Sequence, residues 1–116
     1  QSHKEFDIEQ ILIEHNIPYE KEKTFNSCRF KDTNYVARFD FYIDNKYLIE
    51  YDGAQHFKSV ERWGGEKGYL KRLQHDQEKT SWCKENNIPL IRLNYIDNPQ
   101  INLEDISLET TRYRVV

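Results

Sequence analysis

The chain has 116 residues, enough for one domain with one modest hydrophobic core. Charged residues make up 32% and aromatic residues 14% of it, which is typical of a soluble globular protein and excludes an intrinsically disordered chain. No apolar run approaches the roughly 18 residues that a membrane span needs, and no signal peptide is visible. The formal net charge of −3 argues against a protein that binds nucleic acid on its own.

Cysteine usage and the start of the chain give two further expectations. Cys28 and Cys83 are far apart and form no CxxC motif, which argues against a zinc site and favours a reducing, cytoplasmic compartment. The chain contains no Met and begins with Gln1, so we expect a fragment of a longer protein.

The first predicted helix begins near His3, because residues 2–5 read as a capping box, and it ends near residues 16–18. Glu5 is the acid of that box and lies at the edge of an apolar stripe made of Ile8, Ile11 and Leu12. Residues 19–25 alternate aromatic and charged side chains, which predicts a strand at a sheet edge. Residues 26–34 are expected to form a polar loop.

A β-hairpin is predicted next, with strands before and after a turn at residues 44–46. Alternation places Ala37, Phe39, Phe41 and Ile43 on one face of its first strand. A three-residue loop pairs Ile43 with Tyr47, so Asp40 sits opposite Glu50 at about 5 Å. Two facing carboxylates repel, and a divalent cation with oxygen ligands is the usual remedy. A surface hairpin with poorly placed charges is the alternative.

Residues 53–67 form a long polar connection that contains Gly53, Gly64 and Gly65, of a kind that is often functional. A helix is expected over residues 68–86, with one face made of Tyr69, Leu70, Leu73, Thr80 and Cys83. Asp76 falls inside that arc, whereas His75 points away from it. Asp76 therefore either faces a site or is an edge residue paired with Arg72 or Lys79.

A short buried strand over residues 89–93 follows, and then a last helix that carries Leu103, Ile106 and Leu108. The order is helix, three strands, helix, strand, helix. A helix between two strands of one sheet implies a crossover, so the fold class is α/β, with a mixed β-sheet and helices on its faces.

The order of elements and two short motifs resemble the PD-(D/E)XK nuclease superfamily. The motifs are Asp40 in one hairpin strand and Glu-x-Asp-Gly at residues 50–53. The resemblance implies a restriction-endonuclease-like αβββαβ core and a Mg²⁺ ion held by Asp40, Glu50 and the backbone carbonyl of Tyr51. The chain departs from the superfamily in two places, because no Pro precedes the Asp and Asp52 replaces a Lys. Whether Asp52 is a further ligand stays open.

A closer resemblance is to the very short patch repair (Vsr-like) endonucleases and the EDxHD homing endonucleases of phage introns. Their pattern is a Glu on the first helix, an Asp in the hairpin, a His after the second strand and an Asp on the next helix. The matching residues are Glu5, Asp40, His56 and Asp76. The resemblance implies that His56, oriented by Asp76, activates water in place of the absent Lys. His75 is a competing base, although its direction on the helix argues against it.

The implied function is Mg²⁺-dependent hydrolysis of phosphodiester bonds in double-stranded DNA by a homing-endonuclease catalytic domain. Basic residues would neutralise the DNA backbone without reading bases, and these are Lys58, Arg62, Lys67, Lys71 and Arg72. Lys79 either contacts a phosphate or is solvated. Trp63 and Phe57 either wedge between base pairs or pin their loop to the core. Sequence recognition would need a separate DNA-binding region, and a homodimer is left open.

Two rival functions fit the same residues. A non-catalytic domain of the same fold, which binds nucleic acid or a protein partner, is favoured by the missing Pro and Lys. The retained Asp40, Glu50, His56 and Asp76 oppose it, because an inactive site has no reason to keep charges that cost stability. A metal-dependent hydrolase of small phosphorylated substrates ranks last, since the sequence contains no phosphate-cradling Gly loop.

Overall fold

The computed structural model describes residues 3–53 and 64–108. In chain order the elements are α1 (His3–Glu14), β1 (Tyr19–Arg29), β2 (Val36–Ile43), β3 (Tyr47–Asp52), α2 (Gly65–Glu85), β4 (Leu90–Asn94) and the 3-10 helix η3 (Leu103–Ile106). The strands of these ranges form one sheet in the order β1-β2-β3-β4. The β1–β2 and β2–β3 pairs are antiparallel and the β3–β4 pair is parallel, so the predicted mixed α/β sheet is confirmed.

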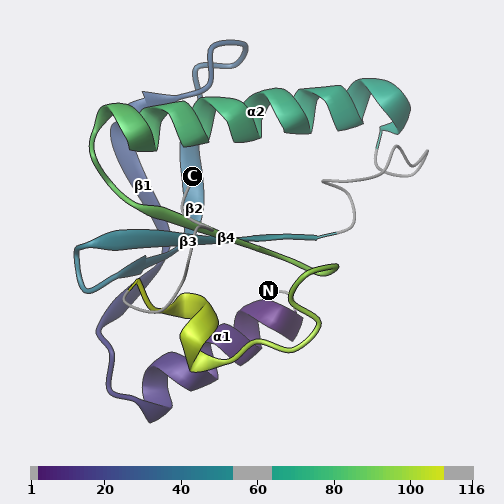
Figure 1. The fold of residues 1–116 in the computed structure, drawn as a ribbon. Helices are drawn as coiled ribbons and strands as arrows, with labels where there is room; N and C mark the ends of the chain where they lie inside the picture. The colour runs from purple at the N-terminus through teal and green to yellow at the C-terminus, as the bar shows by residue number, and fades with distance from the viewer. Residues whose placement is uncertain (1–2, 54–63, 109–116) are drawn as a thin grey trace.

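The sheet separates two layers of helix, with α2 on one side and α1 with η3 on the other (Figure 1). Each side has its own hydrophobic cluster. The cluster on the α1 side contains Ile8, Leu12, Phe41, Ile43, Tyr47, Ile49, Ile91, Leu93 and Ile106. The cluster on the α2 side contains Cys28, Ala37, Phe39, Leu48, Cys83 and Leu90. In the part of the chain that the structure describes, no helix is long and apolar enough to cross a membrane.

Three predicted elements differ from the observed ones. Strand β1 continues to Arg29, because Cys28 is buried in the cluster under α2. Helix α2 begins earlier, at Gly65, after Gly64 adopts the left-handed φ of 94° that favours glycine. The last helix is only the four-residue η3. Leu70, expected in the buried stripe of α2, is 55% exposed, because the buried residues of α2, Lys79 and Cys83, both lie in its second half.

The hairpin register is the predicted one. Ile43 pairs with Tyr47, and Phe41 pairs with Ile49. Asp44 and Asn45 both have positive φ, as a tight hairpin turn requires. However, Phe41 packs on the α1 side and Phe39 on the α2 side, so the expectation that they share a face is wrong. A regular strand would keep them together, and Asp40 lies at the point where the alternation breaks.

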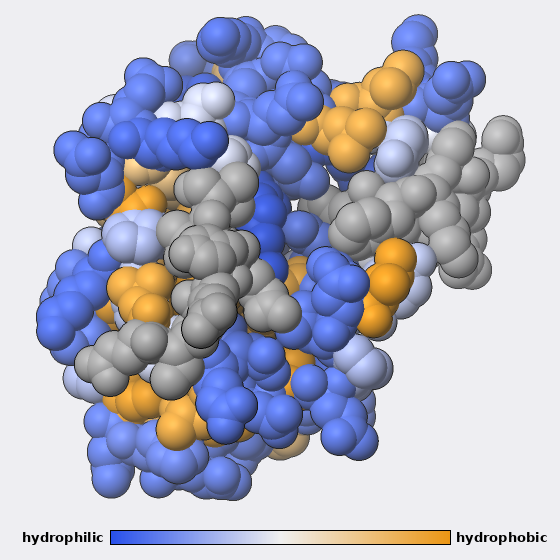
Figure 2. All heavy atoms as spheres, viewed as in Figure 1, coloured by the Kyte–Doolittle hydropathy of each residue, from blue (hydrophilic) through white to orange (hydrophobic). Residues whose placement is uncertain are grey.

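The surface seen in Figure 2 is mostly hydrophilic, with apolar side chains gathered in separate patches among the polar ones. Large apolar side chains that are half exposed or more include Phe6, Ile13, Tyr35, Leu70 and Ile96. They come from α1, the β1–β2 loop, α2 and the segment after β4, so they are scattered along the chain. Scattered exposed apolar residues are ordinary on a soluble domain.

Candidate active site

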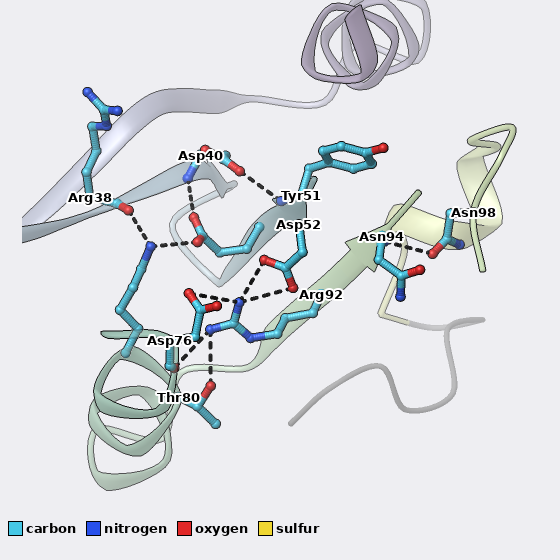
Figure 3. A network of polar contacts seen from close by, with 11 residues as sticks. Arg38, Asp40, Tyr51, Asp52, Asp76, Thr80, Arg92, Asn94 and Asn98 are labelled. Atoms are coloured by element: carbon cyan, nitrogen blue, oxygen red, sulfur yellow. Dashed lines mark hydrogen bonds and ion pairs between the residues drawn. The ribbon is translucent and has the colours of Figure 1, made fainter. Parts of the chain in front are cut away.

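Two acidic side chains link β2 to β3 just beyond the regular pairing of the hairpin (Figure 3). The Asp40 amide donates a hydrogen bond of 2.9 Å to Oε1 of Glu50, and the Tyr51 amide donates one of 2.8 Å to Oδ2 of Asp40. Each carboxylate therefore accepts a backbone N–H of the other strand, which satisfies amides where the strands separate. The structure brings Asp40 and Glu50 together, as the hairpin register predicted.

A lysine from α2 completes this cluster. The Lys79 ammonium donates 2.6 Å to Oε2 of Glu50 and 2.7 Å to the Arg38 carbonyl, and it lies 4.8 Å from the centroid of the Phe39 ring. Only 8% of Lys79 is exposed, so the alternative of a solvated lysine is wrong. Both oxygens of the buried Glu50 carboxylate thus have protein donors.

The neighbouring charges act on the pKa of Asp40. Burial and the neighbouring Glu50 raise the pKa of Asp40 to about 7, opposed by the Tyr51 amide and by Lys79. The charge of Glu5, at the start of α1, also raises the pKa of Asp40. The structure therefore brings the predicted site residue Glu5 into electrostatic range of Asp40. Additional positive charge near Asp40 would stabilise its ionised form.

A second cation joins β3, β4 and α2 beside this cluster (Figure 3). Nη1 of Arg92, on β4, donates to the Asp52 carboxylate at 3.1 and 3.4 Å and lies 3.9 Å from Oδ1 of Asp76. Its Nη2 donates to the Asp76 carbonyl at 3.1 Å and to Oγ1 of Thr80 at 3.2 Å. Asp52, left open as a metal ligand, is thus an ion-pair partner of Arg92.

His75 lies at a different place. Its ring stacks on Phe30 with centroids 3.8 Å apart, and its Nε2 is 2.9 Å from Oδ1 of Asp32. These contacts fasten α2 to the β1–β2 loop. They argue against His75 as the base, in line with its predicted direction on the helix.

Several predicted site residues fall outside the described ranges: His56, Phe57, Lys58, Arg62 and Trp63. Their assignments stay predictions. Among the basic residues that are described, Lys67 and Lys71 are exposed on α2 and Arg72 is half-buried. The Lys71 ammonium lies 3.8 Å from Asp32.

Within residues 3–53 and 64–108, no group of three or more His, Cys, Asp or Glu side chains is arranged to hold a metal ion. The carboxylates that are present can nevertheless be compared with the ligands that Mg²⁺ prefers. Mg²⁺ is usually held by one or two carboxylates, with water and substrate phosphate as the other ligands. Asp40, with its raised pKa, and Glu50 match this requirement for hard oxygen donors.

Two patterns in the sequence indicate the two cations of the site. Arg92 is a lone charge in the apolar strand 90–94, and strand alternation puts Glu50 and Asp52 on one face. The parallel register pairs Glu50 with Arg92, which brings all three side chains to that face. Lys79 precedes the buried Cys83 by four residues, a spacing that places both on one side of a helix.

Comparison of the chain with protein-family models, curated proteins and solved structures found no match. The function must therefore be argued from the chemistry of the site.

Proposed function

We propose that this chain is a metal-dependent endonuclease domain that hydrolyses phosphodiester bonds in double-stranded DNA. The observation that supports the proposal is the buried cluster of Asp40, Glu50 and Lys79 where β2 and β3 separate. It combines two carboxylates suited to a hard cation with an ammonium suited to an anionic phosphate. Burial of such charges destabilises a fold unless each is compensated, which favours a functional reason for keeping them.

Lys79 could also replace the Lys that the PD-(D/E)XK pattern has at the position of Asp52. Members of that superfamily carry a Lys two positions after the metal-binding Glu, where this chain has Asp52. Here an ammonium reaches the same Glu50 carboxylate from α2 at 2.6 Å. We assign Lys79 the role of the missing lysine. The resemblance to Vsr-like and EDxHD homing endonucleases supports the finer proposal of a homing-endonuclease catalytic domain.

In the proposed mechanism Asp40, Glu50 and the Tyr51 carbonyl would hold Mg²⁺, which polarises a phosphate and lowers the pKa of bound water. An ammonium has three donors, and Lys79 directs two of them to Glu50 and to the Arg38 carbonyl. We assign the third to a non-bridging phosphate oxygen or to the attacking water. This contact would stabilise the negative charge that develops during attack.

Other residues would bind DNA and move the proton. His56, on the segment after β3, would take a proton from water, with Asp76 stabilising the imidazolium. Exposed lysines of α2, Lys67 and Lys71, would neutralise backbone phosphates. Because the net charge is −3, we assign sequence recognition to a separate DNA-binding region.

The test uses the full chain fused to a DNA-binding module, with supercoiled plasmid and Mg²⁺. We expect Asp40→Asn, Lys79→Met and His56→Ala to lower the cleavage rate by about 100-fold or more. Lys84→Met removes an exposed lysine near the end of the same helix, outside the proposed catalytic and DNA-binding residues, and serves as the matched control, which should stay within about threefold of wild type. Circular dichroism checks that each variant is folded. Cleavage by Asp40→Asn or Lys79→Met at the control rate contradicts the proposal.

A second candidate is a non-catalytic domain of the same fold that binds nucleic acid or a protein. The observation in its favour is that both Glu50 oxygens already have protein donors, so the cluster also works as an internal ion network. Calorimetric titration with Mg²⁺ and Mn²⁺ separates the two candidates. Metal binding that is lost in Asp40→Asn supports the nuclease. DNA binding without metal binding or cleavage supports the second candidate.

A further inference from the structure

We propose that Arg92 is a positioning residue that holds the middle of α2 against the end of β3, so that Lys79 reaches Glu50. The inference rests on the proposed function, because it assigns Arg92 a role in the same reaction. The described contacts of Arg92 are with Asp52, Asp76 and Thr80, so Arg92 acts through other residues.

The guanidinium joins two elements (Figure 3). Nη1 forms an ion pair with Asp52 at the end of β3 and lies 3.9 Å from the Asp76 carboxylate, while Nη2 bonds to α2 at two places. The side chains of Arg92 and Asp52 are 16% and 11% exposed, so the ion pair is largely shielded from water. The contact therefore ties a helix to a strand through one rigid planar group.

The two α2 contacts flank the proposed catalytic lysine. Asp76 and Thr80 are four residues apart, so they lie one above the other on the helix. Lys79 lies between them in the chain and sends its ammonium to Glu50 at 2.6 Å. A helix advances 1.5 Å and turns 100° per residue, so even a one-residue shift of α2 would break that bond. Arg92 opposes such a shift at the turn that carries Lys79.

The guanidinium group explains why this position is Arg. A planar guanidinium has five donors in fixed directions and can serve a carboxylate, a carbonyl and a hydroxyl together. A lysine ammonium keeps the charge but cannot match this geometry. Position 52 fits the same scheme, since its acid is the anchor on β3 to which Arg92 binds.

The test compares Arg92→Ala and Arg92→Lys with wild type in the full chain fused to a DNA-binding module. We expect kcat to fall about 100-fold in Arg92→Ala and about tenfold in Arg92→Lys, with KM for plasmid within about threefold. Added guanidinium ion at millimolar concentration should raise kcat at least tenfold in Arg92→Ala but not in Lys79→Ala. Hydrogen exchange of the amides of residues 76–82 should be faster in Arg92→Ala.

Thr80→Val is a milder variant that removes one contact and keeps the shape of the side chain. It should lower kcat a few-fold, and it tests the inference even if the Arg92 variants do not fold. A kcat within twofold of wild type in Thr80→Val, or in any folded Arg92 variant, overturns the inference. Equal guanidinium effects on Arg92→Ala and Lys79→Ala overturn it too.

The two proposals fail differently. If Asp40→Asn and Lys79→Met cleave at the wild-type rate, the proposed function fails. If those variants are inactive while the Arg92 and Thr80 variants cleave normally, only the positioning role fails.

Discussion

Helix α2 is tied to the hairpins by acid–base contacts at two places that differ in burial. At one, the side chains of Lys79 and Glu50 are 10% and 6% exposed and lie beside Asp40. At the other, Lys71 and His75 contact the 42%-exposed Asp32 of the β1–β2 loop. Surface ion pairs contribute little because water screens them, whereas a buried charge that loses its partner strongly destabilises the fold. The difference teaches that charged contacts on one helix are not equivalent, and that the buried one is the better candidate for a functional site.

The largest effect is expected from a substitution that breaks the buried ion pair between Lys79 and Glu50. Lys79→Met leaves Glu50 beside Asp40 without its ammonium, and we expect the free energy of unfolding to fall by about 3–5 kcal/mol. Urea denaturation measures this change. The double variant Lys79→Met/Glu50→Gln removes the unpaired charge and should recover most of the stability without recovering cleavage. If Lys79→Met alone is as stable as wild type, the ion pair between Lys79 and Glu50 does not stabilise the fold as expected.

The next largest effect is a pH dependence of the free energy of unfolding, which arises from Asp40. Its folded-state pKa of about 7 exceeds its ordinary value of 3.8, so the folded state binds the proton more tightly between those pH values. The free energy of unfolding should therefore fall as the pH rises through this window, by about 1.4 kcal/mol per unit of pKa difference at most.

Urea denaturation of wild type and Asp40→Asn from pH 4.5 to 7.5 isolates this contribution. The stability of Asp40→Asn relative to wild type should rise with pH in metal-free buffer. Millimolar Mg²⁺ should reduce that trend if Asp40 binds the ion. A difference between the two proteins that stays constant with pH would show that Asp40 does not titrate in this range.

A smaller effect is expected at Glu5. Its charge is one of the weaker causes that raise the pKa of Asp40, after burial and Glu50. Glu5→Gln should therefore move the Asp40 titration to lower pH, in the direction of the ordinary value. The carboxyl ¹³C chemical shift of Asp40, followed by NMR against pH, measures the midpoint. An unchanged midpoint would place Glu5 outside the electrostatic reach of the cluster.

The smallest effect is expected at the exposed contact. A hydrogen bond from His75 lowers the pKa of Asp32, but the Asp32 side chain is exposed, so water screens its ion pairs. Asp32→Asn should leave the denaturation midpoint in urea nearly unchanged and the cleavage rate within about twofold of wild type. A large loss of cleavage would mean that the exposed contact of Asp32 with α2 is needed for function, contrary to our expectation.

Local rules predicted much of the fold. The turn at residues 44–46 and the alternation of β2 and β3 predicted the register that pairs Ile43 with Tyr47, and this register is confirmed. The crossover through α2 predicted the mixed sheet. Element ends were less predictable, because Cys28 extends β1 only through its packing under α2. Leu70 appeared to belong to the buried face of α2, but helical periodicity cannot show where a helix leaves its sheet.

The amino-acid sequence by itself determined that Asp40 and Glu50 meet, because the tight turn at residues 44–46 sets the register of the hairpin and is a local property of the chain. Tertiary structure alone decided which cations lie beside the acids. Lys79 is 29 residues from Glu50 in the chain, and Arg92 is 40 residues from Asp52. Only the packing of α2 and β4 on the sheet brings these cations beside the acids. The break in alternation at Asp40 was likewise decided by packing, because Phe39 and Phe41 are buried in different clusters.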